Sequence, residues 1–304
     1  MVKLTLYIGH ADHTARPVEI ARMADEAGLY GIAVGEHVSL GTDLSNYPYA
    51  GGLLHGDAGR KPYLEPAVLN GAIASVTKQI RITNCVMLAP LRPAVLLAKQ
   101  LTTIDVISGG RCEPCFGTGW SRDEYASLNV DFSRRRQILR DSIGACRALW
   151  ENQPASFHSE TVTFDELYQM PQPVQKRIPI ILGVKANAKN AELVAELCDG
   201  WECGPDVGNS LDQIAEGAQI YREAFAIAGR DPDELAVRAH LPRHMKADGK
   251  RYDLKRIFES VPAMRQAGVT EFATGVTGRL EGPFPDMAAI EDYIGEAAEL
   301  SAKY

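Results

Sequence analysis

The chain has 304 residues, of which 45% are hydrophobic and 23% are charged, and its formal net charge is −7. This composition is typical of a folded protein, and the length suits one α/β barrel, a fold that commonly reaches about 250 residues in a single domain. Nucleic acid and anionic membranes both require a clustered basic surface, so the acidic balance argues against either partner. We therefore expect one domain over residues 1–304 that binds a small molecule.

The start of the chain and its cysteines narrow the class of protein further. A strand-like run begins near Leu4, with no signal-peptide pattern before it and no apolar stretch long enough to cross a membrane, so we expect a cytoplasmic protein. The six cysteines are too sparse for a disulfide scaffold. Cys112 and Cys115 have the spacing of a redox or zinc motif, but residues three apart in a strand point to opposite faces, which favours a structural role.

Short β-branched runs alternate with amphipathic helical patterns along the chain, which is typical of parallel βαβ units. Pro17 opens the first helical pattern and Gly28 stops it, as these residue types commonly do. Together the units predict a (β/α)₈ TIM barrel with inserted loops after strands two and four. The predicted strands cover residues 4–9, 31–34, 80–88, 111–117, 178–183, 200–203, 235–241 and 271–276, and the predicted helices cover residues 17–28, 66–77, 93–107, 134–150, 188–197, 211–226, 254–267 and 287–300.

Three segments interrupt the regular alternation. Residues 38–64 are rich in Gly and Tyr, and a loop of this length is usually a lid or binding loop, with a disordered insertion as the alternative. Residues 157–164 alternate like a small hairpin, and residues 241–251 form another long loop. Pro114 lacks the N–H that a central strand needs, so we expect either a bulge or a shortened pairing in strand four.

Residues at the carboxyl ends of the predicted strands are the candidates for chemistry, because barrel active sites form there. His37 could exchange a proton with a substrate or cofactor, since an imidazole titrates near neutrality; the alternative is a structural hydrogen bond to the adjacent Glu36. His10 and His13 lie three apart, whereas two ligands on one face of a strand need a spacing of two, so no metal is predicted. Other strand-end residues are Met87, Trp201, His240 and Thr274.

Two glycine-containing junctions between a strand and a helix could bind a phosphate. They are Gly117-Thr118-Gly119 and the segment from Gly183 through Val184 and Lys185 to Asn187. Glycine lets a ligand approach the backbone, and the following helix offers N–H donors. Lys185 could add a positive charge, or serve as the imine-forming residue of a metal-free lyase or aldolase. Asn187 could bind the phosphate or cap the helix, and both junctions could simply end their strands.

Several segments together resemble the luciferase-like flavin-dependent monooxygenases. They are YGIAVGEHVSL, IRITNCVMLAPLRPAVLLAKQLTTIDVISGGR, FGTGWSRDEYASLNVDFSRRR, FHSETVTF, PQPVQKRIPIILGV and LCDGWECGP. The resemblance covers roughly residues 2–204 and is closest to the branch that depends on the deazaflavin coenzyme F420. It implies a (β/α)₈ barrel and an oxidoreductase that uses non-covalent FMN or coenzyme F420 on a small organic substrate.

The resemblance also implies roles for particular residues. It places His37 beside the cofactor ring and a non-proline cis peptide, which supports that ring, at Cys85-Val86. The phosphate contacts fall on Thr118, Gly119, Gly183, Val184 and Lys185, and the substrate pocket falls on Tyr47, Tyr63 and Trp120. A homodimer is implied, together with a separate reductase as a possible supplier of reduced cofactor. A non-catalytic flavin or deazaflavin carrier is the alternative function.

Overall fold

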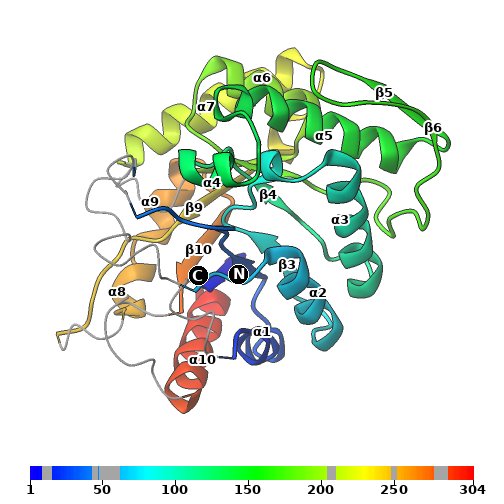
Figure 1. Cartoon of the computed structure of the whole chain (residues 1–304). Coiled ribbons are helices and arrows are strands. Elements are labelled where there is room, and N and C mark those ends of the chain that lie inside the picture. The colour runs from blue at the N-terminus through cyan, green and yellow to red at the C-terminus, as the bar shows by residue number, and fades with distance from the viewer. Residues whose placement is uncertain (9–15, 43–46, 48–61, 204–209, 248–251, 277–286) are drawn as a thin grey trace.

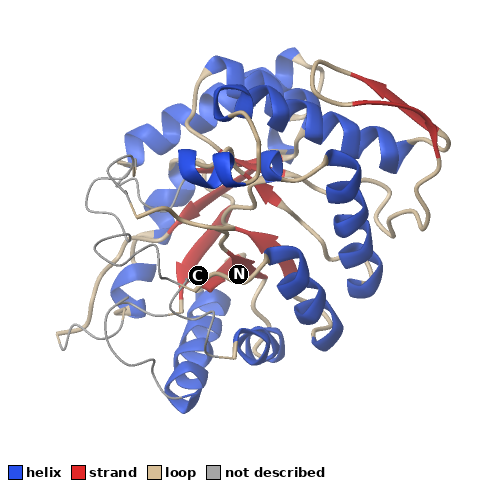
Figure 2. Ribbon diagram, viewed as in Figure 1, coloured by secondary structure: helices blue, strands red, loops and turns tan. Residues whose placement is uncertain are grey.

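A computed structural model of the chain describes residues 1–8, 16–42, 47, 62–203, 210–247, 252–276 and 287–304. Parallel strands form a central sheet that helices surround (Figure 1, Figure 2). The sheet has eight strands in the order β3-β2-β1-β10-β9-β8-β7-β4. Their bounds are β1 Leu4–Ile8, β2 Gly31–Val34, β3 Arg81–Asn84, β4 Cys115–Phe116, β7 Ile181–Gly183, β8 Gly200–Cys203, β9 Ala236–His240 and β10 Glu271–Gly275.

Backbone contacts between the two ends of this sheet close the barrel. Isolated parallel bridges join Ile82 to Cys112 and Met87 to Phe116, alongside β3 and β4. The N–H of Met87 donates to the carbonyl of Cys115 at 2.8 Å, and the N–H of Gly117 returns a bond to the carbonyl of Met87 at 3.0 Å. The predicted (β/α)₈ barrel is therefore confirmed.

The helices agree closely with the predicted ranges, apart from two differences. Residues 122–127 form a short helix that the sequence analysis did not predict, and the predicted helix over 254–267 is two helices, the second of which has Pro262 in its first turn. The helix bounds are α1 Pro17–Glu26, α2 Pro66–Val76, α3 Ala94–Ser108, α4 Arg122–Ser127, α5 Arg135–Glu151, α6 Ala188–Leu197, α7 Leu211–Ile227, α8 Leu254–Phe258, α9 Val261–Gln266 and α10 Met287–Lys303.

The predicted hairpin lies outside the barrel, where β5 (Ala155–His158) and β6 (Thr163–Leu167) pair antiparallel beside α5 (Figure 2). Among the described residues, no helix is both long and apolar enough to cross a membrane.

Strands β3 and β4 are shorter than predicted. The regular part of β3 ends at Asn84, one residue before the Cys85-Val86 peptide. Of the two alternatives for Pro114, the shortened pairing is observed, since β4 has only two residues. The carbonyl of Pro114 still accepts a hydrogen bond from the N–H of Ile181 at 3.0 Å. Proline therefore removes only the hydrogen bond that a backbone N–H at this position would donate.

The interior of the barrel contains a buried charge network, which the sequence analysis did not predict. Arg238 of β9 has a side chain only 1% exposed and donates to Thr83 at 3.0 Å and to Glu271 at 2.8 Å. It also pairs with Glu113 and lies 3.5 Å from Glu202. A buried cation requires such partners, because an unpaired charge in the interior is strongly destabilising. The network connects strands on opposite sides of the barrel below its carboxyl end.

Candidate active site

His37 follows β2 and is held by a carboxylate from another part of the chain. Its Nδ1 lies 3.1 Å from Oε2 of Glu124, whose side chain is fully buried at the start of α4. The other oxygen of Glu124 accepts from the N–H of Val38 at 2.5 Å. Ser121 caps α4 and accepts from the N–H of Glu124 at 3.3 Å, which fixes the position of that carboxylate. Both the imidazole and its carboxylate partner are thus held in place.

The adjacent Glu36 is not the partner of His37, so that alternative is wrong. Glu36 pairs with Arg92 at 2.5 Å and accepts from the N–H of Leu88 at 2.6 Å. Neighbouring residues of an extended segment point to opposite sides, which explains why the two side chains separate. Burial raises the pKa of Glu36 above its ordinary value, against the opposing effect of the Arg92 charge.

Aromatic side chains that the sequence analysis assigned to the substrate pocket lie next to the His37 ring. The ring centroid of Tyr63 lies 5.0 Å from that of His37, and the Trp120 centroid lies 5.5 Å away, both with edge-to-face geometry. Tyr47 packs on Trp120 with centroids 5.2 Å apart. The three residues therefore lie close together near the imidazole. Most of the loop that carries Tyr47 and Tyr63 lies outside the described residues.

The peptide bond between Cys85 and Val86 is cis, as the sequence analysis predicted. The side chain of Val86 packs between the two glycine junctions. An ideal Cβ on Gly117 would lie 2.4 Å from Cγ2 of Val86, and one on Gly183 would lie 2.5 Å from Cγ1. Both distances are too short for real contacts, so the absence of side chains at these glycines makes room for Val86. The structure therefore accounts for both glycines through side-chain packing, whereas the sequence analysis explained them by the approach of a ligand.

Comparison with known proteins identifies the family. A family model described as luciferase-like monooxygenase matches residues 5–269. The chain belongs to the luciferase-like monooxygenase family. An uncharacterised protein of Mycobacterium tuberculosis is 31% identical over 272 residues, which cover 88% of this chain and 90% of that protein.

A relative of known activity and a solved structure also match. The FMNH₂-dependent dimethylsulfone monooxygenase of Pseudomonas putida is 25% identical over 168 residues, which cover 54% of this chain and 45% of that protein. The fold matches that of an F420-dependent secondary alcohol dehydrogenase, solved with an F420–acetone adduct, with a TM-score of 0.74 at 15% identity over 99% of both chains. Members of the luciferase-like monooxygenase family are oxidoreductases, and this chain is one of them.

The residues predicted to contact a phosphate lie at the ends of two neighbouring strands of this luciferase-like barrel. Strands β4 and β7 pair in parallel, so Thr118 and Lys185 follow adjacent strand ends. Thr118 is half-buried and Lys185 is exposed. Gly119, between Thr118 and Trp120, has a positive φ of 67°. This donor set fits the phosphate of an FMN-type or F420-type cofactor.

Other predicted residues make structural hydrogen bonds or lie outside the described residues. Asn187 caps α6 by accepting from the N–H of Asn190 at 3.0 Å. The carbonyl of Val184 accepts from the indole of Trp201 at 2.8 Å. An imine-forming lysine is normally desolvated, and the exposure of Lys185 gives no support to the lyase alternative. His10 and His13 lie outside the described residues.

Glu124 is the residue of this site that the sequence analysis missed. The sequence does contain a local pattern at this position. Glu124 follows Ser121 by three residues, and this spacing is typical of the start of a helix. That pattern predicts α4 but not the contact with His37, since the two residues are far apart in the chain and meet only in the folded barrel.

Proposed function

We propose that the chain binds reduced FMN or reduced coenzyme F420 without a covalent bond, at the carboxyl ends of β3, β4 and β7, and acts on a small organic substrate next to His37. The observation that carries this proposal is that His37, held by Glu124, lies at the same end of the barrel as Thr118 and Lys185. The hydroxyl of Thr118 and the ammonium of Lys185 bind the phosphate side, while the resemblance implies that the Cys85-Val86 peptide supports the cofactor ring. A reduced flavin supplies electrons for reaction with O₂, and a reduced deazaflavin supplies a hydride.

His37 is the residue that holds or moves a proton in this proposal. An ionised carboxylate can only accept hydrogen bonds, so Glu124 selects the tautomer of His37 that carries hydrogen on Nδ1. The Nε2 atom then exchanges the proton with substrate or cofactor. Tyr63 and Trp120 pack edge-to-face on the imidazole and limit the access of water to it.

The two cofactors imply different partners. The Pseudomonas putida relative is named for FMNH₂, and the structural neighbour is named for F420. If the cofactor is FMN, a separate reductase supplies it in reduced form; we also propose a homodimer, as the family resemblance implies. Equilibrium titration of the purified protein with each cofactor, read by fluorescence, distinguishes the two. Saturable binding of either one supports the proposal, and binding of neither overturns it.

The role of His37 is tested by comparing turnover with cofactor affinity. His37→Gln should lower turnover about 10²- to 10⁴-fold, because general acid–base catalysis typically contributes that factor, while the cofactor dissociation constant stays within about twofold. Glu124→Gln should lower turnover less and shift its pH profile, because the imidazole keeps its place but loses its ionic partner. His158→Ala is the matched control, since His158 pairs with Asp165 at 2.8 Å on the exposed hairpin. Unchanged turnover in His37→Gln contradicts the proposed role.

A further inference from the structure

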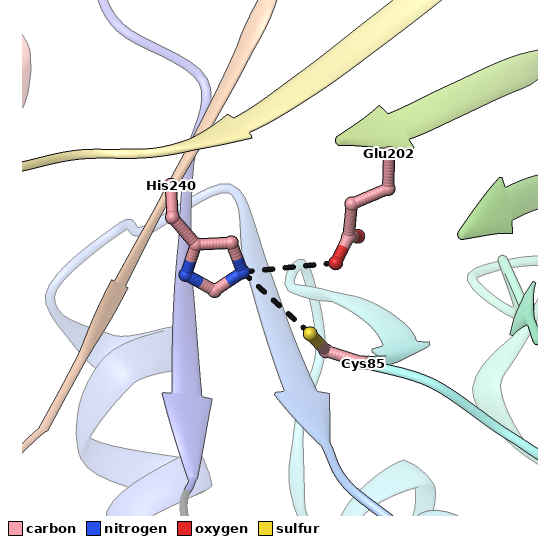
Figure 3. A group of neighbouring side chains, drawn as sticks. All are labelled: Cys85, Glu202 and His240. Carbon is pink, nitrogen blue, oxygen red and sulfur yellow. Dashed lines mark hydrogen bonds and ion pairs between the residues drawn. The ribbon is translucent and has the colours of Figure 1, made fainter. Parts of the chain in front are cut away.

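Three side chains with metal-binding atoms converge at the carboxyl end of the barrel (Figure 3). Cys85 follows β3, Glu202 lies in β8 and His240 ends β9. The Sγ of Cys85 lies 3.6 Å from Nε2 of His240, and Oε1 of Glu202 lies 3.6 Å from the same nitrogen. All three donor atoms lie within 4.8 Å of one another. A sulfur, a nitrogen and an oxygen thus face one common point.

These separations match the size of a zinc coordination sphere. Zn²⁺ binds thiolate sulfur at about 2.3 Å and imidazole nitrogen or carboxylate oxygen at about 2.0–2.2 Å, in tetrahedral geometry. Such bond lengths place two neighbouring donor atoms roughly 3.3–3.6 Å apart. The 3.6 Å distances from His240 to Cys85 and to Glu202 already lie at that value. The third separation, between Cys85 and Glu202, is no more than 4.8 Å.

The burial of the Glu202 carboxylate adds to the indication of a ligand. Its side chain is only 1% exposed, and Oε2 faces Arg238 at 3.5 Å. Oε1, the oxygen that faces the cluster, accepts no hydrogen bond of normal length within the described part of the chain, and its partner His240 lies 3.6 Å away. A buried carboxylate oxygen that is so weakly compensated is costly, because it has lost its bonds to water. A bound cation would satisfy it.

The ion pairs of Glu202 are long. Arg238 is the fully buried positive group next to Glu202, but it is shared with Glu113 and Glu271. Glu113 also lies 3.7 Å from Arg81, and Glu271 lies 3.6 Å from Lys3, so each of these two carboxylates has a second cation. Among the described residues, the ion pairs of Glu202 are those with Arg238 at 3.5 Å and with His240 at 3.6 Å, so a bound cation would add to the compensation of its charge.

We propose that Cys85, Glu202 and His240 form a binding site for a Zn²⁺-class cation, in addition to the function proposed above. Mixed sulfur and nitrogen donors select such borderline-soft ions over Mg²⁺ and Ca²⁺, which prefer oxygen. Three protein ligands leave the fourth position for a water molecule. Binding forms the metal–sulfur bond, breaks the S–H bond of Cys85 and releases that proton to the solvent.

A nucleophilic triad is the other chemistry that these residue types can perform, and the geometry does not fit it. In such a triad the carboxylate orients the imidazole through one ring nitrogen while the other nitrogen contacts the nucleophile. Here Glu202 and Cys85 both face Nε2 of His240, as Figure 3 shows. The sulfur and the carboxylate oxygen approach the same ring nitrogen, as they do when all three atoms bind one metal ion.

Metal titration of the full chain, freed of bound metal with a chelator, tests the site. Calorimetry with Zn²⁺ should show one equivalent bound, and Co²⁺ should give the near-ultraviolet absorption of a thiolate–cobalt bond. Mg²⁺ should not bind in the same range. Each of Cys85→Ser, Glu202→Gln and His240→Ala should weaken Zn²⁺ binding by at least about 10- to 100-fold, the range seen when even an outer partner of a metal site is lost.

Matched controls separate this site from unspecific metal binding. Cys146→Ala removes another buried thiol, on α5, and His158→Ala removes a histidine paired with a carboxylate on the hairpin. Both variants should still bind one equivalent of Zn²⁺ and show the absorption of the thiolate–cobalt bond. Thermal unfolding without metal checks that every variant is folded, and Glu202→Gln keeps the size of the side chain in case Cys85→Ser is unstable. No Zn²⁺ binding by the wild-type chain, or unchanged affinity in Glu202→Gln and His240→Ala, overturns the proposal.

Discussion

Replacing Gly117 by alanine tests whether Val86 is held by contact with the glycine junctions. The new Cβ would lie 2.4 Å from Cγ2 of Val86, whereas ordinary contacts of this kind fall between 3.4 and 4 Å. One of the two residues must therefore move by about 1 Å, and overpacking of this kind typically costs about 1–3 kcal/mol. Because Gly117 does not have a positive φ, the cost comes from the contact and not from backbone strain.

The assay is thermal and denaturant unfolding of a double-mutant cycle. Gly117→Ala alone should lower the midpoint by roughly 2–4 °C for each kcal/mol of lost stability, the scale for chains somewhat shorter than this one. Val86→Ala removes both methyl groups that press on the glycines, so Gly117→Ala should be nearly neutral in that background, with a coupling energy of about 1–3 kcal/mol.

Gly71→Ala is the control for the substitution itself. Gly71 lies in α2 with nothing within 4 Å of a new Cβ, so alanine there should leave stability unchanged or raise it by up to about 1 kcal/mol through helix propensity. If Gly117→Ala costs the same in the wild-type chain and in the Val86→Ala background, the contact is not the cause and the reasoning is refuted.

Two further predictions concern buried charges. Burial raises the pKa of Asp25, but the N–H groups of residues 78, 79 and 80 outweigh that effect and hold the pKa below its ordinary value of 3.8. Asp25→Asn should therefore lower the free energy of unfolding by about 1–3 kcal/mol near neutral pH. In urea unfolding, the difference from the wild-type chain should shrink as the pH falls below about 4, and a difference that does not depend on pH contradicts this. Arg238→Met should lose about 3–5 kcal/mol, because it removes the fully buried cation that three buried carboxylates share. Arg140→Met, which breaks an exposed pair with Glu196, should lose no more than about 1 kcal/mol, and similar losses for the two variants in chemical denaturation would count against the network.

The sequence predicted the candidate site only in part. His37 and Trp120 were assigned from strand ends and from the family resemblance, Tyr63 was assigned from the resemblance alone, and the structure brings the three together. The partner of His37 was not predictable in the same way, since Glu36 next to it looked equally suitable and Glu124 approaches only when α4 packs over the barrel. The cluster of Cys85, Glu202 and His240 was missed for a similar reason. The sequence analysis searched one strand for metal ligands and predicted none, whereas these donors come from three strand ends.

Local patterns by themselves determined most of the secondary structure. Helix α6 over Ala188–Leu197 and strand β8 over Gly200–Cys203 match their predicted ranges, because helix caps, glycine stops and apolar periodicity act within a few residues. Only the tertiary structure decided that Gly117 and Gly183 make room for Val86 and that Arg238 joins carboxylates from across the barrel. Those contacts depend on the closure of the sheet, which brings together strand ends that are distant in the chain.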